Sequence, residues 1–157
     1  IEASLKAAKA KRVTTIINTA PLTADAARLS KLANIVIANE TEFELLIGKN
    51  GLSSSDREKE LSALHAETGQ TLIVTLDADG VIAIRNGKLF KAMGLKIEPV
   101  DTVGAGDTFC GYLAASLDAG LGLEQAMRRA AVAGSLACLN PGAQPAIPLA
   151  KEVDALV

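Results

Sequence analysis

The chain has 157 residues, of which 49% are hydrophobic and 22% are charged, and its formal net charge is -2. This composition is typical of a globular protein and excludes a disordered chain, and no apolar run approaches the roughly 20 residues of a membrane-spanning helix. The charge provides no basic field for nucleic acid or anionic lipid. We therefore expect a single domain whose partner is a small molecule or another protein.

The first half of the chain alternates helical segments with apolar, strand-like segments. Thr23 is a good N-cap for the second helix, and Gly48 is expected to end the third. The strand-like segments are continuous apolar runs, which is typical of strands buried on both faces. The expected elements are helices over residues 1–12, 23–33, 40–48 and 56–69, and strands over residues 13–18, 34–39 and 71–76.

The second half of the chain begins with a different pattern. Asn86-Gly87 stands between two strand-like runs, and this dipeptide is the strongest short-range signal for a β-hairpin. Helices are then expected from Asp107 onward and over residues 123–139, where small residues permit close packing. The alternation predicts an open α/β sheet with a meander, in which ligands bind beyond the carboxyl ends of the strands.

Other single residues suggest little chemistry. Cys110 and Cys138 lie far apart without a CxxC pattern, so neither a zinc site nor a disulfide framework is indicated. Free thiols and no signal peptide favour a reducing cytoplasm. His65 has no partner at ligand spacing and is predicted to be a surface residue. Because the chain opens inside an amphipathic helix and without methionine, we expect it to be a piece of a longer protein.

The stretch VDTVGAGDTF, residues 100–109, carries the clearest chemical signal. The chain contains no GxxxxGK(S/T) pattern, and this stretch lacks the GxGxxG spacing of a dinucleotide site. Instead, Gly104 and Gly106 stand at the start of a helix, where backbone N–H groups are unpaired and carry partial positive charge. Because glycine permits unusual dihedral angles and close approach, these N–H groups are predicted to converge on one oxyanion.

Asp107 stands beside this predicted anion hole. The helix terminus favours its ionised form, and a carboxylate placed there would orient and deprotonate a substrate hydroxyl during phosphoryl transfer. The alternative is structural, because Asp is a favoured N-cap residue worth about 1 kcal/mol. The residues of this stretch alone do not decide between the two readings.

VDTVGAGDTFCG closely resembles the C-terminal signature of the ribokinase-like sugar kinases, the phosphofructokinase-B family. Four other segments resemble the same family in the same order, so the likeness covers essentially the whole chain. They are NTAP (18–21), ANETEFELLIG (38–48), VTLDADGV (74–81) and GAQPAIP (142–148). The resemblance implies a three-layer α/β/α fold, and it implies that residues 1–157 are the C-terminal, nucleotide-binding and catalytic part of one kinase domain.

The resemblance also implies roles for individual residues. Asp107 would be the catalytic base that contacts the sugar hydroxyl, and the amides of Gly104, Ala105 and Gly106 would form the anion hole. Asn39 would contact ATP phosphates, and Glu42 would hold Mg2+ through water. The structural alternative for these two is a capping box at a strand-to-helix junction.

A nucleotide-binding loop is implied after the third strand, and one of its residues departs from the family pattern. Members of the family commonly have glycine where this chain has Asp77, and a carboxylate near ATP phosphates is unfavourable unless it faces solvent or a cation. The residues implied to contact the nucleotide are Thr75, Leu76, Asp77, Ala78, Asp79, Gly80, Gly106, Asp107 and Ala131.

A monovalent cation, usually K+, is implied beside the anion hole. Asp101 would supply a carboxylate, although it could instead accept hydrogen bonds from nearby loop amides. Ala146 replaces a serine that is often found there, which removes one possible oxygen. The backbone carbonyls implied as ligands belong to Val103, Ala137, Asn140 and Gly142.

The implied activity is transfer of the γ-phosphoryl group of ATP to a sugar hydroxyl, most simply that of D-ribose. Fructose, 2-keto-3-deoxygluconate and adenosine remain alternative acceptors, because the N-terminal half of such kinases supplies most acceptor contacts. That half also carries a lid that often mediates dimerisation, so a homodimer is a possible assembly. A non-catalytic nucleotide-binding module is the alternative of a different class.

Overall fold

The computed structural model describes residues 1–157. The chain forms two compact units. The first unit consists of residues 1–76 and 82–90, and the second consists of residues 77–81 and 91–157.

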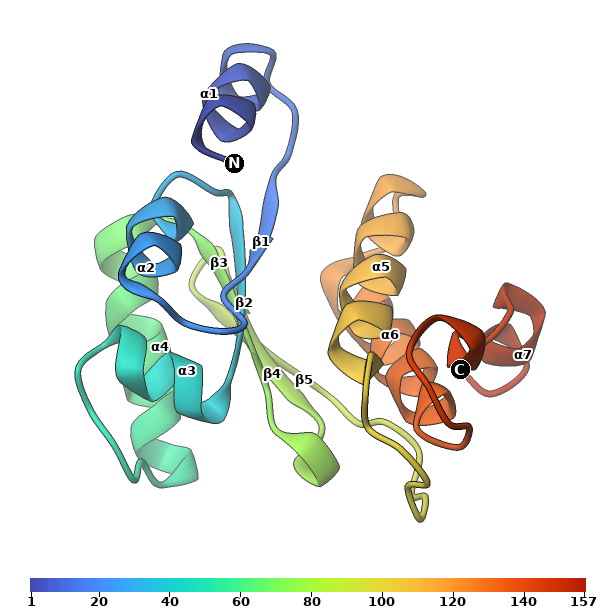
Figure 1. Ribbon diagram of the computed structural model, residues 1–157. Helices are drawn as coiled ribbons and strands as arrows, with labels where there is room; N and C mark the ends of the chain where they lie inside the picture. Colours follow the sequence, from blue (N-terminus) through green and yellow to red (C-terminus); the bar gives the residue numbers. More distant parts are fainter. The chain divides into compact units, whose positions relative to one another are not determined.

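The first unit is built on a β-sheet whose strands follow the chain in the order β1-β2-β3-β4-β5 (Figure 1). Strands β1, β2 and β3 are parallel, with Ile17 opposite Val36 and Asn39 opposite Thr75. The elements are α1 (Glu2–Ala10), β1 (Ile16–Asn18), α2 (Ala24–Ser30), β2 (Ile35–Asn39), α3 (Glu40–Leu46), α4 (Ser54–Thr68), β3 (Thr71–Thr75), β4 (Val81–Arg85) and β5 (Lys88–Ala92).

Strands β4 and β5 form the predicted hairpin. Asn86 and Gly87 connect them, and both have positive φ angles, 51° and 72°, as a type I′ turn requires. Consecutive strands without a helical crossover must reverse direction, so β3, β4 and β5 form the expected meander.

Strands β2, β3 and β4 are buried along nearly their whole length. Ile35, Val36, Ile37 and Ala38 are each at most 3% exposed, although successive side chains point to opposite faces. The strand residues are therefore buried regardless of the face to which they point, as the apolar runs predicted. Helices α2, α3 and α4 lie together on one face of the sheet (Figure 1), and Phe43 and Leu61 belong to the core there.

The helix ends agree with the sequence in some places and differ in others. Thr23 caps α2 as predicted, because its side chain accepts a hydrogen bond from the Ala26 amide. Helix α4 begins before its predicted start, since Ser53 is the N-cap and its side chain accepts from the Asp56 amide. Gly69 ends α4 in a left-handed conformation.

His65 is partly exposed and makes two hydrogen-bond contacts that the sequence did not indicate. Its Nδ1 lies 2.6 Å from the Gln70 carbonyl oxygen, and its Nε2 accepts a hydrogen bond from the Gly87 amide at 3.0 Å. The half-buried ring therefore links the end of α4 to the hairpin turn.

The second unit consists mainly of two packed helices, α5 (Ala105–Asp118) and α6 (Leu123–Ala137), followed by the short helix α7 (Ala150–Asp154). Close packing depends on small residues, because a Cβ added at Gly134 would lie 3.3 Å from the Ala105 carbonyl oxygen. Val132 and Val153 form the core between α6 and α7. The unit also contains two 3-10 turns, Asp77–Asp79 and Gln144–Ala146.

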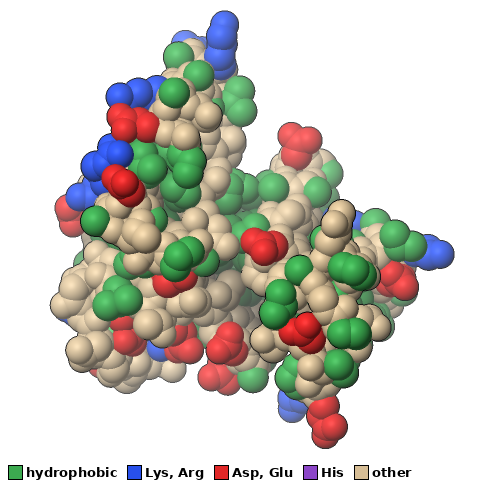
Figure 2. Space-filling view, viewed as in Figure 1, with side chains coloured by type: hydrophobic (Ala, Val, Ile, Leu, Met, Phe, Trp, Pro, Cys, Tyr) green, Lys and Arg blue, Asp and Glu red, His purple; other side chains and the backbone are tan.

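Positive charge gathers on α1 and the neighbouring part of α2 (Figure 2). Glu2 offsets part of this positive charge through ion pairs with Lys6 at 2.7 Å and Arg28 at 2.8 Å. These two ion pairs lower the pKa of Glu2 to about 2. None of the helices combines the length and the apolar character that a membrane span requires.

Candidate active site

Helix α5 begins at Ala105, earlier than the predicted start at Asp107. Its N-cap is Gly104, with a φ angle of 80°. A Cβ at Gly104 would lie 2.8 Å from the Cβ of Ala143, so both the dihedral angle and the available space require glycine. Gly106 differs from the prediction, since it is helical with no positive φ, and a Cβ there would meet nothing within 4 Å. Its missing side chain leaves open space beside the helix start.

The backbone amides of this first turn are mostly unpaired. The Thr108 amide donates to the Gly104 carbonyl at 2.8 Å, and the Ala105 amide donates to the Thr102 carbonyl at 3.2 Å. The amides of Gly104, Gly106 and Asp107 donate no hydrogen bond within the protein. The unpaired amides therefore include that of Asp107 itself. The amide of Ala105, which was predicted to belong to the anion hole, has a partner within the protein.

Asp107 is the third residue of α5, and its carboxylate is exposed without a hydrogen bond or ion pair. The alternative reading of Asp107 as the N-cap is wrong, because Gly104 holds that position and no side chain caps the helix. Asp107 also borders a hollow of about 420 Å³, whose wall includes Tyr112 and Ile147. The carboxylate is thus accessible beside amides that favour negative charge.

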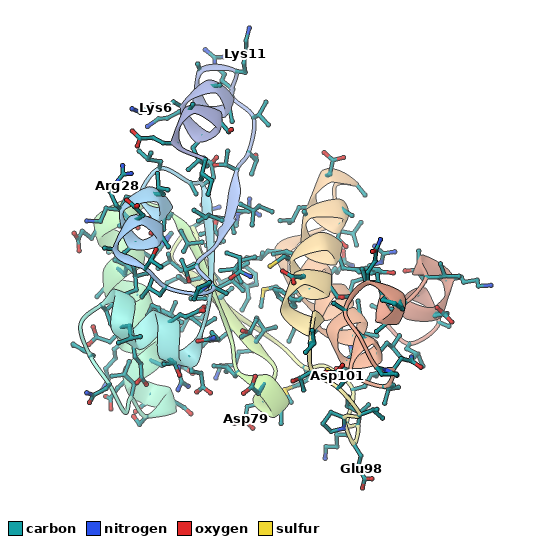
Figure 3. The ribbon with its side chains drawn as sticks, viewed as in Figure 1. Lys6, Lys11, Arg28, Asp79, Glu98 and Asp101 are labelled. Atoms are coloured by element: carbon teal, nitrogen blue, oxygen red, sulfur yellow. The ribbon has the colours of Figure 1, made fainter.

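Asp101 lies in the loop before α5 (Figure 3) and is held by backbone amides. Its Oδ1 accepts from the Val103 amide at 3.0 Å, and its Oδ2 accepts from the Gly142 amide at 2.8 Å. These two bonds hold the pKa of Asp101 below its usual value. Asp101 therefore accepts hydrogen bonds from loop amides, as its structural alternative predicted. These bonds keep the carboxylate ionised, and each of its oxygens retains a further lone pair.

Three carbonyls of the implied cation site belong to the end of α6 and the loop after it, namely those of Ala137, Asn140 and Gly142. The Cys138 carbonyl accepts from the amides of Val100 and Asp101, which joins the loop to the helix terminus. The Ala137 carbonyl has only a 3.5 Å contact with the Asn140 amide. No hydrogen bond reaches the carbonyls of Val103, Asn140 or Gly142.

The electrostatics of this region favour a cation, because the helix C-terminus is partially negative and Asp101 adds a full charge. Ala146 is 3% exposed, and its methyl group supplies no oxygen.

The predicted nucleotide loop contains a residue in an unusual conformation. Asp77 has a φ angle of 46°, in the left-handed region that favours glycine. Asp is one of the few other residues that tolerate it, so the glycine-like turn survives the departure from the family pattern. Gly80 has a φ of 86°, and a Cβ there would collide with the Ala92 carbonyl oxygen. Ala78 and Asp79 are exposed, and Asp79 is visible on this turn in Figure 3.

Asp77 also acts electrostatically within the second unit. Burial raises the pKa of the Cys138 thiol, and the charges of Asp101 and Asp77 raise it further. Both carboxylates therefore lie near the end of α6. Ala131, on α6, is half-buried and offers a ligand only its methyl group, because its carbonyl accepts from Ser135 Oγ at 2.9 Å.

In the first unit, Asn39 and Glu42 form a complete capping box. The Asn39 Oδ1 accepts from the Glu42 amide at 2.8 Å, and the Glu42 Oε2 accepts from the Asn39 amide at 3.1 Å. The structural alternative is thus fully present. The Asn39 side-chain NH2 and the Glu42 Oε1 form no hydrogen bond and stay available. One free carboxylate oxygen fits Mg2+, which proteins bind through one or two carboxylates together with water and phosphate oxygens.

Thr75 lies beside Asn39 at the carboxyl ends of two parallel strands. Leu76 packs against the hydrophobic core, so only its backbone is available to a ligand. Asn39, Glu42, Thr75 and Leu76 belong to the first unit, and the other predicted site residues belong to the second.

Sequence reasoning missed Thr19, which is fully buried and whose hydroxyl reaches Glu42. It lies within the NTAP segment, and the resemblance gave this segment no role. Thr108, next to Asp107, was also missed; its buried hydroxyl has no partner.

Comparison with known proteins places the chain in a family. The model of the pfkB family carbohydrate kinases matches residues 1–150. This chain belongs to the pfkB family of carbohydrate kinases. It is 32% identical over 152 residues to the ribokinase of Haemophilus influenzae, covering 97% of this chain and 50% of that protein. It is 33% identical over 131 residues to a fructokinase of Escherichia coli, covering 79% and 41% respectively.

The fold agrees with solved pfkB-family structures. A ribokinase of Arabidopsis thaliana complexed with ribose and ATP has a TM-score of 0.86 and 29% identity, with 97% of this chain and 50% of that chain covered. The predicted fold class is therefore confirmed. The chain spans about half the length of the curated relatives it matches.

Proposed function

We propose that this chain supplies the nucleotide-binding and catalytic part of an ATP-dependent sugar kinase. The observation that carries the proposal is the first turn of α5, where the exposed, unpaired carboxylate of Asp107 stands beside free backbone amides. Membership of the pfkB family supports the class of reaction, and relatives named ribokinase and fructokinase support a sugar as acceptor.

In the proposed reaction, Asp107 accepts the proton of the acceptor hydroxyl as that oxygen bonds to the γ-phosphorus of ATP. The bond between the γ-phosphorus and the bridging oxygen breaks, and ADP leaves with the electron pair. The free amides of Gly104, Gly106 and Asp107 stabilise the negative charge on the transferring group without reorganising. This arrangement needs no side chain at Gly106, which leaves the phosphoryl group room to approach.

Further nucleotide contacts follow from the family resemblance, residue by residue. We propose that the Asn39 NH2 group donates to phosphate oxygens and that the Glu42 Oε1 holds the hydration shell of Mg2+. Bound Mg2+ supplies positive charge that offsets the charge of the phosphates. The loop over residues 75–80 contacts the nucleotide through its backbone, and Ala131 provides apolar contact.

The carbonyls at the end of α6, together with Asp101, are proposed to hold K+. The amide bonds to Asp101 fix its carboxylate near the first turn of α5, so the loop is ordered before any cation binds. This cation would support the backbone of the anion hole and take no part in bond breaking.

D-ribose is the proposed acceptor, and the test is acceptor-dependent release of ADP by the intact polypeptide that carries this sequence. ATP, Mg2+ and K+ are supplied with ribose, fructose, 2-keto-3-deoxygluconate or adenosine. We expect ribose to give the largest kcat/KM. A clearly larger value for another acceptor would replace ribose but keep the kinase. ATP binding without phosphorylation of any acceptor would favour the non-catalytic module.

A further inference from the structure

Thr19 follows β1 and is fully buried, with 0% of its surface exposed. Its amide donates to the Ile37 carbonyl at 3.0 Å, which extends the pairing of β1 with β2. Its hydroxyl lies 3.2 Å from the same carbonyl oxygen and 3.4 Å from Glu42 Oε2. Because a hydroxyl carries one proton, this donor is shared between a strand and the first turn of α3.

Glu42 is only 8% exposed and has no cationic partner. Burying a carboxylate is costly unless hydrogen bonds compensate. In Glu42 only one of the two carboxylate oxygens accepts such hydrogen bonds. Oε2 accepts hydrogen bonds from the backbone amide of Asn39 and from the Thr19 hydroxyl, whereas Oε1 accepts none. The Thr19 hydroxyl and the Asn39 backbone amide together fix the orientation of the carboxylate. The Asn39 backbone amide alone would leave the carboxylate free to rotate.

We infer that Thr19 is a positioning residue for the proposed kinase reaction, because it holds Oε2 of Glu42 and thereby keeps Oε1 presented to a hydrated divalent cation. This inference rests on the proposed function of Glu42. Valine at position 19 would match the shape of threonine and preserve the amide bond to Ile37. It would remove only the hydroxyl, with its contacts to Glu42 and to the Ile37 carbonyl, so the change separates hydrogen bonding from packing.

The test measures binding of Mn2+, as a stand-in for Mg2+, to the intact polypeptide in the presence of ADP, by electron paramagnetic resonance of the free ion. Thr19→Val is expected to weaken Mn2+ binding about tenfold, as loss of a partner that orients a metal-holding group does. Thr19→Ser keeps the hydroxyl and should stay close to the wild-type value. Thr71→Val is the matched control, since Thr71 is also buried but begins β3 at the opposite end of the strands.

A second readout is the Mg2+ dependence of phosphoryl transfer. In Thr19→Val the half-saturating Mg2+ concentration should rise, and kcat should recover at saturating Mg2+. Equal Mn2+ affinity in Thr19→Val and wild type would overturn the role of Thr19 and leave the kinase proposal intact. Equal weakening in the valine and serine variants, with a matching loss of thermal stability, would show a packing role and also overturn it. Absence of Mn2+ binding by the wild type with ADP would overturn the assignment of Glu42 as well.

Discussion

Helices α3 and α5 both carry an acidic residue at their third position, yet the two residues have opposite surroundings. Glu42 is buried and closes a capping box, whereas Asp107 is exposed and has no partner. Folding explains the presence of Glu42, because the start of α3 depends on it. Folding does not explain Asp107. The comparison shows that an acidic residue in a first helical turn indicates function most clearly where the helix cap makes no use of it.

The difference originates in the N-cap residues. Asn39 has a side-chain oxygen that accepts the Glu42 amide, so the reciprocal bond forms. Gly104 has no side chain, and its left-handed conformation begins α5 without any side-chain cap. The amides that a side chain would otherwise satisfy are left for a ligand.

The largest expected effect comes from Asp107→Asn. We expect kcat to fall roughly 10³- to 10⁴-fold, because the general base is lost. The free energy of unfolding should change by less than about 1 kcal/mol, since the carboxylate has no partner to lose. A coupled assay of ADP release and urea unfolding measure both quantities. Asp118→Asn, at the other end of α5, is the control and should retain activity. Near-normal turnover in Asp107→Asn would remove Asp107 from the catalytic role.

The two glycines of the same turn should separate folding from function. Gly104→Ala forces alanine into a left-handed conformation against Ala143, so we expect a loss of about 2 kcal/mol or more in unfolding free energy, together with loss of activity. Gly106→Ala should leave the free energy of unfolding unchanged or raise it by less than about 1 kcal/mol, because alanine is the better helix former. Its KM for ATP should nevertheless rise. An unchanged KM would place the phosphoryl group elsewhere.

Asp77 offers a smaller effect on nucleotide affinity. Asp77→Gly removes a negative charge while suiting the left-handed backbone, so ADP and ATP should bind about fivefold more tightly, equivalent to about 1 kcal/mol of charge repulsion. Asp77→Asn is the matched variant, because it removes the charge and still tolerates that conformation. Isothermal titration calorimetry gives both affinities. If only the glycine variant bound more tightly, backbone strain rather than charge would be responsible.

The smallest effect is the pH dependence contributed by Asp101. Amide bonds lower its folded pKa, so its stabilising contribution is complete above its unfolded pKa and is lost as the pH falls through the folded value. The difference in unfolding free energy between wild type and Asp101→Asn should be constant above about pH 5 and shrink at lower pH. Urea unfolding across this range measures it. A difference that stays constant at acid pH would contradict the role of the Gly142 and Val103 amides.

Local rules predicted many elements correctly from the sequence. Thr23 caps its helix, and Asn86-Gly87 makes the hairpin turn, because each effect depends on neighbouring backbone groups only. The start of α4 was placed too late, since the serines at 53, 54 and 55 offer several local caps, and the structure uses Ser53. The hydrogen bond from the Gly87 amide to His65 was not predicted, because the two residues are distant in the sequence.

The sequence by itself determined the alternation of helices and apolar strands, the glycines before α5 and the acidic residue beside them, because these depend on periodicity and local backbone chemistry. Only the tertiary structure decided that Thr19 reaches Glu42, that the distant Gly142 amide joins the local Val103 amide in holding Asp101, and that nothing holds Asp107. The physical reason is that hydrogen bonds between Thr19 and Glu42, or Asp101 and Gly142, join residues that only chain folding brings within reach.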